Sequence, residues 1–471
     1  MTRYTLRALA AQWRAWSGTV VVLALAAVLV DVCLAHRMTV TRPDVVAAAR
    51  DAGVSPRELA VPGVSMYFYS AMVAIPVVAV VGQSCVQALR TSWARWRLAG
   101  ALPRQVLASV VATVAVLGAV ACVPGILVGL AVDQPFAEVL TRMAAQRMGR
   151  IEVAQTPATA ALTVVSVVGI AVIGAIGPAR SAVRTPATEA VRTASPVPVR
   201  RRMGVVRWVL AGAWALVCAG QLLVALLVRP GEEIIDGLPT GGGQAALASF
   251  LLAVLAVLVA PVLVPGLLRV WSAPLGRVGR LGGLGGSWLI ARRSALWRSS
   301  LAASAIALLS LAFSFAAVLV TNLEVARAVI RAAHLHAVLS QTDSLVLASI
   351  LGAMALLGAI AVVAMASRSR QREIAVLRCA GTTIGRVRAQ VVIEAGLYVG
   401  TALIISIVPT AVTAVGEALF FARAGLPFLP RPAVGTLALV ALASFAALTA
   451  VLLAPVRRAY RAPIGPTLAA E

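Results

Sequence analysis

The sequence contains no lysine, so all 41 of its basic residues are arginine. The Walker phosphate-binding loop requires a Lys that reaches the phosphates, so this chain has no such loop with which to bind ATP. Charged residues make up only 12% of the chain, whereas 61% of the residues are hydrophobic. A soluble chain of 471 residues needs more polar surface than this composition supplies. The composition therefore excludes a soluble globular protein and indicates a membrane protein.

Cysteine is also scarce, and its placement excludes further kinds of site. The five cysteines lie within or beside apolar segments or in Arg-rich loops: Cys33, Cys85, Cys122, Cys218 and Cys379. They form no set that could pair outside the membrane, so we expect neither a disulfide framework nor a cysteine metal site. We likewise predict no catalytic residue, no cofactor site and no metal site on this chain.

Ionisable residues are rare inside the apolar segments, whereas carriers driven by an ion gradient keep such groups at mid-depth in the membrane. Asp31 lies near the end of the first segment and Glu394 near the start of the ninth. Neither is central. Asp31 fits a helix-packing group better than a proton site, and both interpretations stay open. The scarcity of such groups argues against an ion-coupled secondary carrier.

Long continuous apolar runs predict about ten transmembrane helices, because a helical span needs about 20 apolar residues and each run is of that length. The third run carries Gly125 and Gly129, a spacing that favours close helix contact. The predicted spans are Ser17 to Ala35, Met66 to Ala88, Val106 to Val132, Pro157 to Gly177, Val205 to Val228, Ala245 to Leu268, Ser300 to Thr321, Leu345 to Ala366, Val391 to Val415 and Val434 to Ala454.

Arginine is distributed unevenly between the two sets of loops. With alternating loops, 29 Arg fall on the side of the N-terminus and 12 on the other side, where 12 of the 17 acidic residues also lie. Basic residues near span ends are retained on the cytoplasmic side, so both termini are predicted to be cytoplasmic. The excess charge of +24 thus follows from the topology and from attraction to the anionic inner leaflet, and no nucleic-acid partner is needed to explain it.

Segments near the two ends of the chain repeat each other in the same order. They predict two parallel four-helix units around a central helix pair, over residues 1–192, 193–275 and 276–471. The aligned pairs are Arg97 with Arg378, Ala99 with Ala380, Gly100 with Gly381 and Val106 with Val387, followed by Pro178 with Pro455, Arg180 with Arg457, Arg184 with Arg461 and Pro186 with Pro463; Trp13-Arg14 also matches Trp297-Arg298.

Residues 370–400, RQREIAVLRCAGTTIGRVRAQVVIEAGLYVG, carry an Arg-Glu-Ile-Ala run, a Leu-Arg pair, a small residue before Gly, a basic turn and then a Glu. This segment closely resembles the FtsX-like permease family of ABC transporters, which includes MacB-type and bacitracin-exporter-type permeases. Residues 178–192 and 289–300 resemble other parts of the same family. The matching positions are Arg372, Glu373, Ile374, Leu377, Arg378, Gly381, Arg386 and Glu394.

The resemblance implies that the loops Arg90 to Arg104 and Arg368 to Arg388 form coupling helices for ATP-binding subunits. In the second loop, Ile374, Val376 and Leu377 are expected on one apolar side. Glu373 is expected to pair with an Arg of this chain or of a partner. The implied coupling residues are Arg372, Glu373, Leu377, Arg378, Gly381 and Arg386, with Arg97, Gly100 and Arg104 as a weaker second site.

The first loop departs from the family pattern, because Ser92 and Trp93 stand where Glu373 and Ile374 stand in the second. Partner docking is therefore less expected there. The basic residues Arg90 and Arg95 serve equally well as anchors at the lipid headgroups.

The resemblance further implies a permease subunit of an ATP-driven transporter in the bacterial plasma membrane. It would move or extract an amphipathic, lipid-like or antimicrobial substrate at the outer leaflet. The implied partners are two copies of a cytoplasmic ATP-binding subunit, which would bind the ATP, and either a homodimer or an asymmetric monomer fits them. An FtsX-type regulator of an extracellular cell-wall enzyme is the alternative, and short outer loops, such as the 23 residues from Asn322 to Ser344, argue against it.

Overall fold

The structure is a computed structural model of the chain that divides into two compact units, Met1–Arg192 and Thr193–Glu471. The break at residue 192 falls where the first repeat is predicted to end, and the separation of residues 193–275 from residues 276–471 stays a prediction. The residues that the structure describes are 13–51, 53, 55–144, 151–184, 203–231, 234–235, 238–239, 241–281, 285–335, 341–365 and 367–461. The aligned residues Pro186 and Pro463 lie outside them.

Ten helices in the described residues are long and apolar enough to cross a membrane, so the predicted all-α polytopic membrane fold is confirmed. Several are longer than predicted: the third reaches from Pro103 to Thr141, although about 20 residues suffice for a span. The ten segments are Trp16–Val40, Leu59–Gln87, Pro103–Thr141, Pro157–Val183, Val205–Leu227, Gln244–Leu275, Ser300–Ala332, Leu345–Met365, Ile384–Arg423 and Val434–Arg457.

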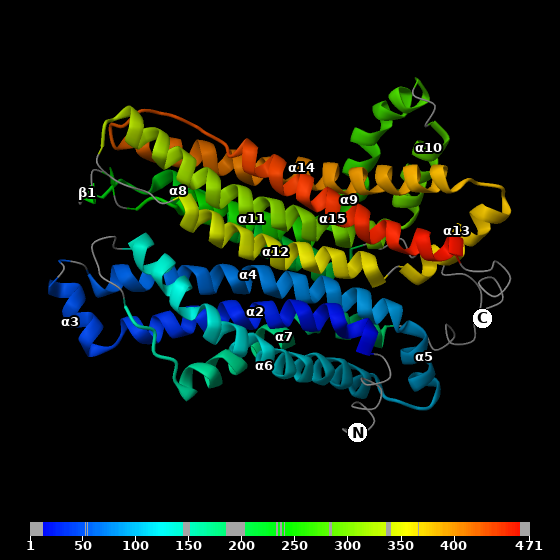
Figure 1. The fold of residues 1–471 in the computed structure, drawn as a ribbon, viewed down its shortest axis with the longest axis horizontal. Coiled ribbons are helices and arrows are strands. Elements are labelled where there is room, and N and C mark those ends of the chain that lie inside the picture. The colour runs from blue at the N-terminus through cyan, green and yellow to red at the C-terminus, as the bar shows by residue number, and fades with distance from the viewer. Residues whose placement is uncertain are drawn as a thin grey trace. The chain divides into compact units, whose positions relative to one another are not determined.

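The described part of the first unit contains four long helices and two short ones (Figure 1). Helix α2 packs against α4, α6 and α7 and forms the centre of the unit. Four of the helices begin with proline, whose missing N–H is no loss at a position without an intrahelical partner. The helices are α2 (Trp13–Val40), α3 (Pro43–Asp51), α4 (Pro56–Ala88), α5 (Arg90–Leu98), α6 (Pro103–Ala144) and α7 (Pro157–Val183).

The second unit is built around α11, which packs against α9, α12, α14 and α15 and is the most deeply buried span. One two-residue hairpin, in which β1 (Ile234–Ile235) pairs antiparallel with β2 (Leu238–Pro239), interrupts the helices without changing the fold class. The helices are α8 (Val205–Leu227), α9 (Gln244–Leu281), α10 (Gly285–Trp297), α11 (Ser299–Ala332), α12 (Gln341–Met365), α13 (Ser367–Cys379), α14 (Ile384–Arg423) and α15 (Val434–Arg461).

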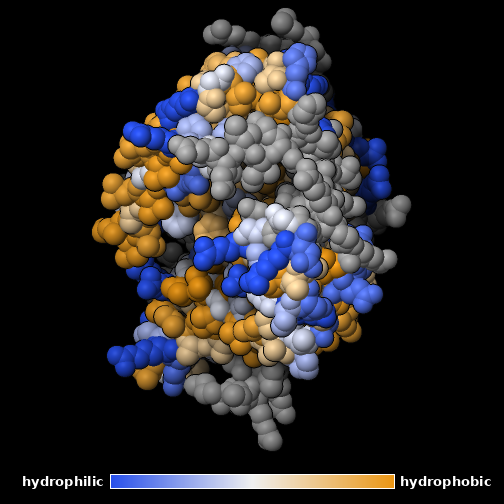
Figure 2. All heavy atoms as spheres, turned by 90° about the vertical axis from the view of Figure 1, so that its left-hand side faces the viewer, coloured by the Kyte–Doolittle hydropathy of each residue, from blue (hydrophilic) through white to orange (hydrophobic). Residues whose placement is uncertain are grey.

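Large hydrophobic side chains are exposed along the spans, as lipid contact requires. Helix α8 exposes Trp208, Leu216 and Leu227 among others. Figure 2, which shows the face at the left of Figure 1, has broad areas of hydrophobic side chains beside hydrophilic ones. In water such patches would mark association surfaces, whereas a lipid environment accommodates them along the length of a helix.

Glycine allows α6 to approach α2 closely at two points one helical turn apart. A Cβ atom added at Gly125 would lie 2.4 Å from Cβ of Ala27 and 3.0 Å from the carbonyl oxygen of Ala24. A Cβ atom added at Gly129 would lie 2.5 Å from Oδ2 of Asp31. The Gly125 and Gly129 spacing thus serves the close contact that the sequence suggests.

Replacing Gly125 by Ala should destabilise the protein, although Ala is otherwise the better helix former. The added methyl group has no room against Ala27, and such overpacking costs about 1–3 kcal/mol. Gly169→Ala on α7 is the matched control, because an added Cβ there meets nothing within 4 Å and should leave stability unchanged or raise it. Thermal unfolding in detergent measures both variants. Equal shifts in the same direction would contradict the packing argument.

Candidate functional site

The short helix α5 connects the second and third long helices of the first unit and is fixed there by one aromatic side chain. Trp93 is buried, with 7% of its surface exposed, and Ala94 beside it is fully buried. The rings of Trp93 and Trp96 meet edge to face, 5.4 Å apart between centroids. Since α5 is otherwise polar and basic, this inward face holds the helix against the ends of the long helices.

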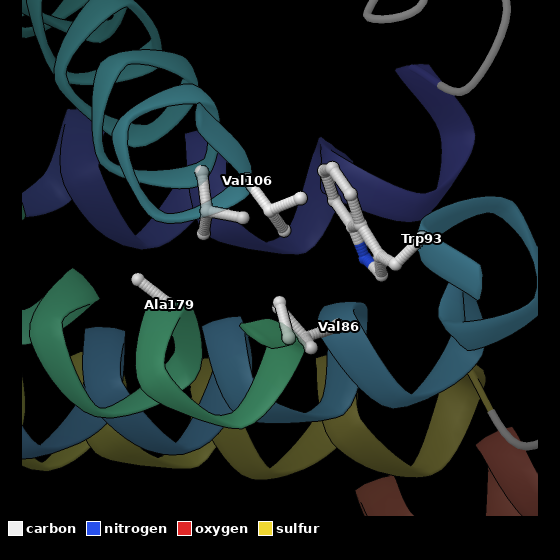
Figure 3. Close-up of a cluster of buried hydrophobic side chains, with 6 residues drawn as sticks. Val86, Trp93, Val106 and Ala179 are labelled. Carbon is white, nitrogen blue, oxygen red and sulfur yellow. The ribbon is translucent and has the colours of Figure 1, made fainter. Parts of the chain in front are cut away.

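Trp93 belongs to a cluster contributed by four helices (Figure 3). Its ring points from α5 toward Val106 of α6, with Val86 of α4 and Ala179 of α7 nearby. The buried members of the cluster are Val86, Trp93, Val106, Val110, Ala179 and Ala182. A displacement of α5 would therefore disturb the packing of three long helices, α4, α6 and α7.

Helix α13 occupies the equivalent place in the second unit, and the aligned residues there are buried in the same way. Ile374 and Ala375, which align with Trp93 and Ala94, are 5% and 2% exposed. Three aligned positions further along the chain are also buried in both units. They are Val387, Val391 and Val456 in the second unit and Val106, Val110 and Ala179 in the first. The sequence repeat is thus also a repeat of packing.

Helix α5 ends in a glycine turn. The N–H of Gly100 donates to the carbonyl oxygen of Arg97 at 3.1 Å, and the N–H of Ala101 donates to that of Trp96 at 3.0 Å. Gly100 has a φ of +87°, a conformation that glycine adopts without strain. These two hydrogen bonds define a Schellman cap, which ends the helix and turns the chain into α6.

Helix α13 ends in the same turn at the aligned positions. The N–H of Gly381, with a φ of +75°, donates to the carbonyl oxygen of Arg378 at 3.0 Å. The N–H of Thr382 donates to that of Leu377 at 3.0 Å. Both predicted coupling loops therefore share one local geometry, which gives Gly100 and Gly381 a defined structural role.

The aligned arginines Arg97 and Arg378 each contact the last long helix of their repeat. Nη1 of Arg97 donates to the carbonyl oxygen of Val183 at 3.0 Å. Cζ of Arg378 lies 4.9 Å from the ring centroid of Tyr460, the residue that aligns with Val183. The hydroxyl of Tyr460 donates to the carbonyl oxygen of Thr382 at 2.9 Å, which connects α15 to the turn after α13. Each short helix is thus joined to a membrane helix distant in sequence.

Glu373 forms an ion pair with Arg298, an arginine of its own chain. Arg298 is the residue between α10 and α11, and its side chain is only 12% exposed, whereas that of Glu373 is 53% exposed. Glu373 thus connects α13 to the start of α11. In the first unit Ser92 stands at the aligned position and offers no carboxylate.

The other predicted coupling residues differ in exposure. The side chains of Arg104 and Arg386 are exposed, and that of Leu377 is half-buried. The backbone of Arg372 lies in α13, and its side chain is outside the described part of the structure. Their contact with a partner stays a prediction.

The expected apolar side of α13 was wrong in one residue. Ile374 faces inward, but Val376 is 59% exposed and Leu377 is half-buried. Each helical residue turns by about 100°, so positions two apart point in nearly opposite directions. Val376 therefore presents an apolar side chain on the outer surface of α13.

Trp93→Ala should release α5 from the long helices of its unit. Truncating a buried Trp costs about 3–5 kcal/mol, and here the loss is concentrated on a nine-residue helix. We expect rapid trypsin cleavage at Arg95 or Arg97 in this variant, followed by mass spectrometry. Leu98→Ala on the exposed side of α5 should leave the cleavage rate unchanged, and equal rates in both variants would contradict the anchoring role.

The sequence did not indicate Arg298 and Tyr460 as parts of the site. Both lie in segments that the repeat aligns, Arg298 after Trp297 and Tyr460 in the tail that follows Pro455. Their alignment marked them as recurring positions but not as contacts of α13. Only the packing of helices that lie 75 or more residues apart brings them to Glu373 and Arg378.

A known protein family matches part of the first unit. Residues 64–187 match the model of the family described as FtsX-like permease C-terminal, which covers α5, α6, α7 and most of α4. The match lies in the first repeat, the copy without the Arg-Glu pair. No curated protein matches the chain. The family match confirms the resemblance seen in the sequence over residues 64–187 of this multi-pass membrane protein, which are similar to the FtsX-like permease domain.

Proposed function

We propose that the chain is the membrane subunit of an ATP-driven ABC transporter and that α5 and α13 are the helices on which ATP-binding subunits dock. The observation that carries the proposal is the shared construction of these two helices. Each joins two spans, buries one face, ends in the same glycine cap and contacts the last long helix of its repeat through an aligned arginine. FtsX-like permeases generally work with ABC ATP-binding subunits, which supports the assignment of the partner.

The contacts of α13 supply a mechanical route from a docked partner to the spans. Glu373 connects the helix to Arg298 at the start of α11, Arg378 connects it to α15, and Gly381 leads into α14. A push on α13 would therefore reach three long helices of the second unit. Binding energy or ATP-driven motion of the partner would be converted in this way into helix movement.

The partner would supply the ATP chemistry. The chain has no Lys for a Walker loop, and members of the family are generally non-catalytic membrane subunits. Two ATP-binding subunits, one at each short helix, fit the duplicated construction, and α13 is the stronger candidate because its segment carries more of the family pattern. In this proposal both termini and both short helices lie on the cytoplasmic side of a bacterial plasma membrane, because basic residues near span ends are retained there.

The proposed substrate is amphipathic or lipid-like, including antimicrobial compounds of that kind, taken from the outer leaflet. Broad apolar helix surfaces support this class, because such a substrate can reach the protein from within the bilayer. The FtsX-type alternative, a regulator of an extracellular cell-wall enzyme, would use the same docking helices for a different output.

Co-purification tests the proposal. The chain would be co-expressed with each stand-alone ABC ATP-binding subunit of the source organism, and one pair should form a complex whose ATP hydrolysis depends on the chain. Reconstituted vesicles should then move a fluorescent lipid or a labelled antimicrobial peptide when ATP is added. A complex that hydrolyses ATP but moves neither probe, while stimulating a cell-wall hydrolase, would favour the regulator. Failure of every pair to associate would contradict both.

A further inference from the structure

Two buried carboxyl groups meet at one side-chain amide in the first unit. Asp31 of α2 is 0% exposed and Asp133 of α6 is 4% exposed. Nε2 of Gln155, in the segment before α7, lies 2.9 Å from Oδ2 of Asp31 and 2.5 Å from Oδ2 of Asp133. The hydroxyl of Thr163 on α7 donates to Oδ1 of Asp31 at 2.8 Å. The two acids therefore share one donor group.

The hydrogen-bond donors do not suffice for two carboxylates. The amide nitrogen of Gln155 carries two hydrogens, so it can donate one to each acid. With Thr163, three of the four carboxyl oxygens have partners, and Oδ1 of Asp133 is buried without one. Buried carboxylates are costly unless they are paired or fully hydrogen-bonded.

Neither Asp31 nor Asp133 forms an ion pair among the described residues. Helix α7 contributes Arg180 only near its opposite end. The neighbouring elements carry other ionisable groups, and none of those that the structure describes forms an ion pair with Asp31 or Asp133. The basic ones include Arg37 on α2, His36 on α2, which contacts the carbonyl oxygen of Leu59, Arg42, which pairs with Asp44, Arg50 on α3, Arg57 on α4 and Arg104 on α6. The acidic or weakly acidic ones include Cys33 on α2, Asp51 on α3, Tyr67 on α4, which donates to Ser166, Cys85 on α4, Cys122 and Glu138 on α6, and Glu152 beside Gln155.

The surroundings hold the two acids in place. Gly129 leaves room for the carboxyl group of Asp31, because a Cβ there would lie 2.5 Å from Oδ2. Gln134, one residue after Asp133, fixes the segment that carries Gln155: its Nε2 donates to the carbonyl oxygen of Ile151 at 3.0 Å, and its Oε1 accepts from the N–H of Val153 at 3.1 Å. The arrangement is therefore built from α2, α6, α7 and the segment before α7.

We propose that Asp31 and Asp133 form a proton-binding site that holds one proton on the pair at neutral pH. The proton adds to a carboxylate oxygen, for which the unpartnered Oδ1 of Asp133 is the available position. It leaves one negative charge, which the hydrogen atoms of Gln155 and Thr163 stabilise. Loss of this proton would leave two negative charges facing the shared amide of Gln155, and their repulsion would loosen the contact of Asp31 and Asp133 with the segment before α7. This site is separate from the proposed docking helices.

Infrared spectroscopy of the purified full chain in lipid tests the proposal, because only a protonated carboxyl group gives the carbonyl stretch of a carboxylic acid. Difference spectra at neutral pH between the wild type and Asp133→Asn, and between the wild type and Asp31→Asn, should each show the loss of one such band. After either substitution the remaining acid has no second carboxylate to repel it and ionises. Asp44→Asn, which removes an exposed acid, should leave the band unchanged.

Two variants keep the test decisive if one of them fails to fold. An unchanged carboxylic-acid band in both variants would overturn the proposal. A second arm compares thermal unfolding in sodium chloride and in choline chloride. A stabilisation by sodium that both substitutions abolish, with no protonated band in the wild type, would identify a metal-cation site and also overturn the assignment to a proton. A folded pair of variants with neither effect would make the cluster a packing feature only.

Discussion

A membrane-impermeant maleimide should label one cysteine of this chain, Cys379, and only from the cytoplasmic side. All five cysteines are described, and Cys379 at the end of α13 is exposed while the other four are buried. The native protein therefore carries its own reporter at the proposed docking helix. Labelling should be strong in inside-out vesicles and absent in intact cells, because the loop with Cys379 belongs to the Arg-rich side.

The control for this experiment is Cys379→Ser, which should abolish labelling in inside-out vesicles while leaving the protein folded. If intact cells are labelled and Cys379→Ser removes this labelling, α13 lies on the outer side of the membrane. That result would overturn the predicted topology. Labelling that persists in the control would show that a cysteine found buried is reachable. The first result would remove the basis for docking an ATP-binding subunit at α13.

Val376→Asp should weaken the binding of the ATP-binding subunit by about 30-fold, if α13 is docked through its outer surface as proposed. Val376 exposes an apolar side chain one turn before Cys379, and a buried interface anchor of this kind is worth about 2 kcal/mol or more. The substituted carboxylate would lose its water on docking, which adds to the loss. Affinity of the purified partner and the ATP hydrolysis that depends on the chain both measure the effect.

Two further substitutions serve as a control and as a comparison for Val376→Asp. Val434→Asp changes a similarly exposed valine at the start of α15, the end of this helix that is far from Tyr460 and α13. It should leave partner affinity unchanged. Leu98→Asp on α5 tests the first repeat. We expect a smaller loss there than for Val376→Asp, because that copy lacks the Arg-Glu pair. Equal losses for Val376→Asp and Val434→Asp would show a general effect of the added charge and contradict docking at α13.

The helices and the glycine turns could be predicted from local sequence. Each span is a continuous apolar run, and Gly100 and Gly381 follow the last turn of a short basic helix, where glycine readily provides the positive φ. These signals act over a few residues, so one sequence suffices to find them. The alignment of Arg97 with Arg378 likewise marked two positions that the structure gives corresponding contacts.

The contacts between distant helices could not be predicted in the same way. Glu373 was expected to pair with an arginine, but 41 arginines were available and only the packing of α13 near the start of α11 selects Arg298. The predicted third span ended at Val132, one residue before Asp133. Helix α6 continues to Ala144, and the contact with Gln155 makes this buried carboxyl tolerable.

The most direct test of docking at α13 is the rate at which maleimide modifies Cys379 with and without the bound ATP-binding subunit. The proposed interface covers this thiol, so saturation with the partner should slow its modification by about tenfold or more, the factor expected when 1.4 kcal/mol is needed to expose it. A cysteine introduced at the exposed position Val434 provides the uncovered reference. An unchanged rate at Cys379 in a complex that hydrolyses ATP would contradict the central claim.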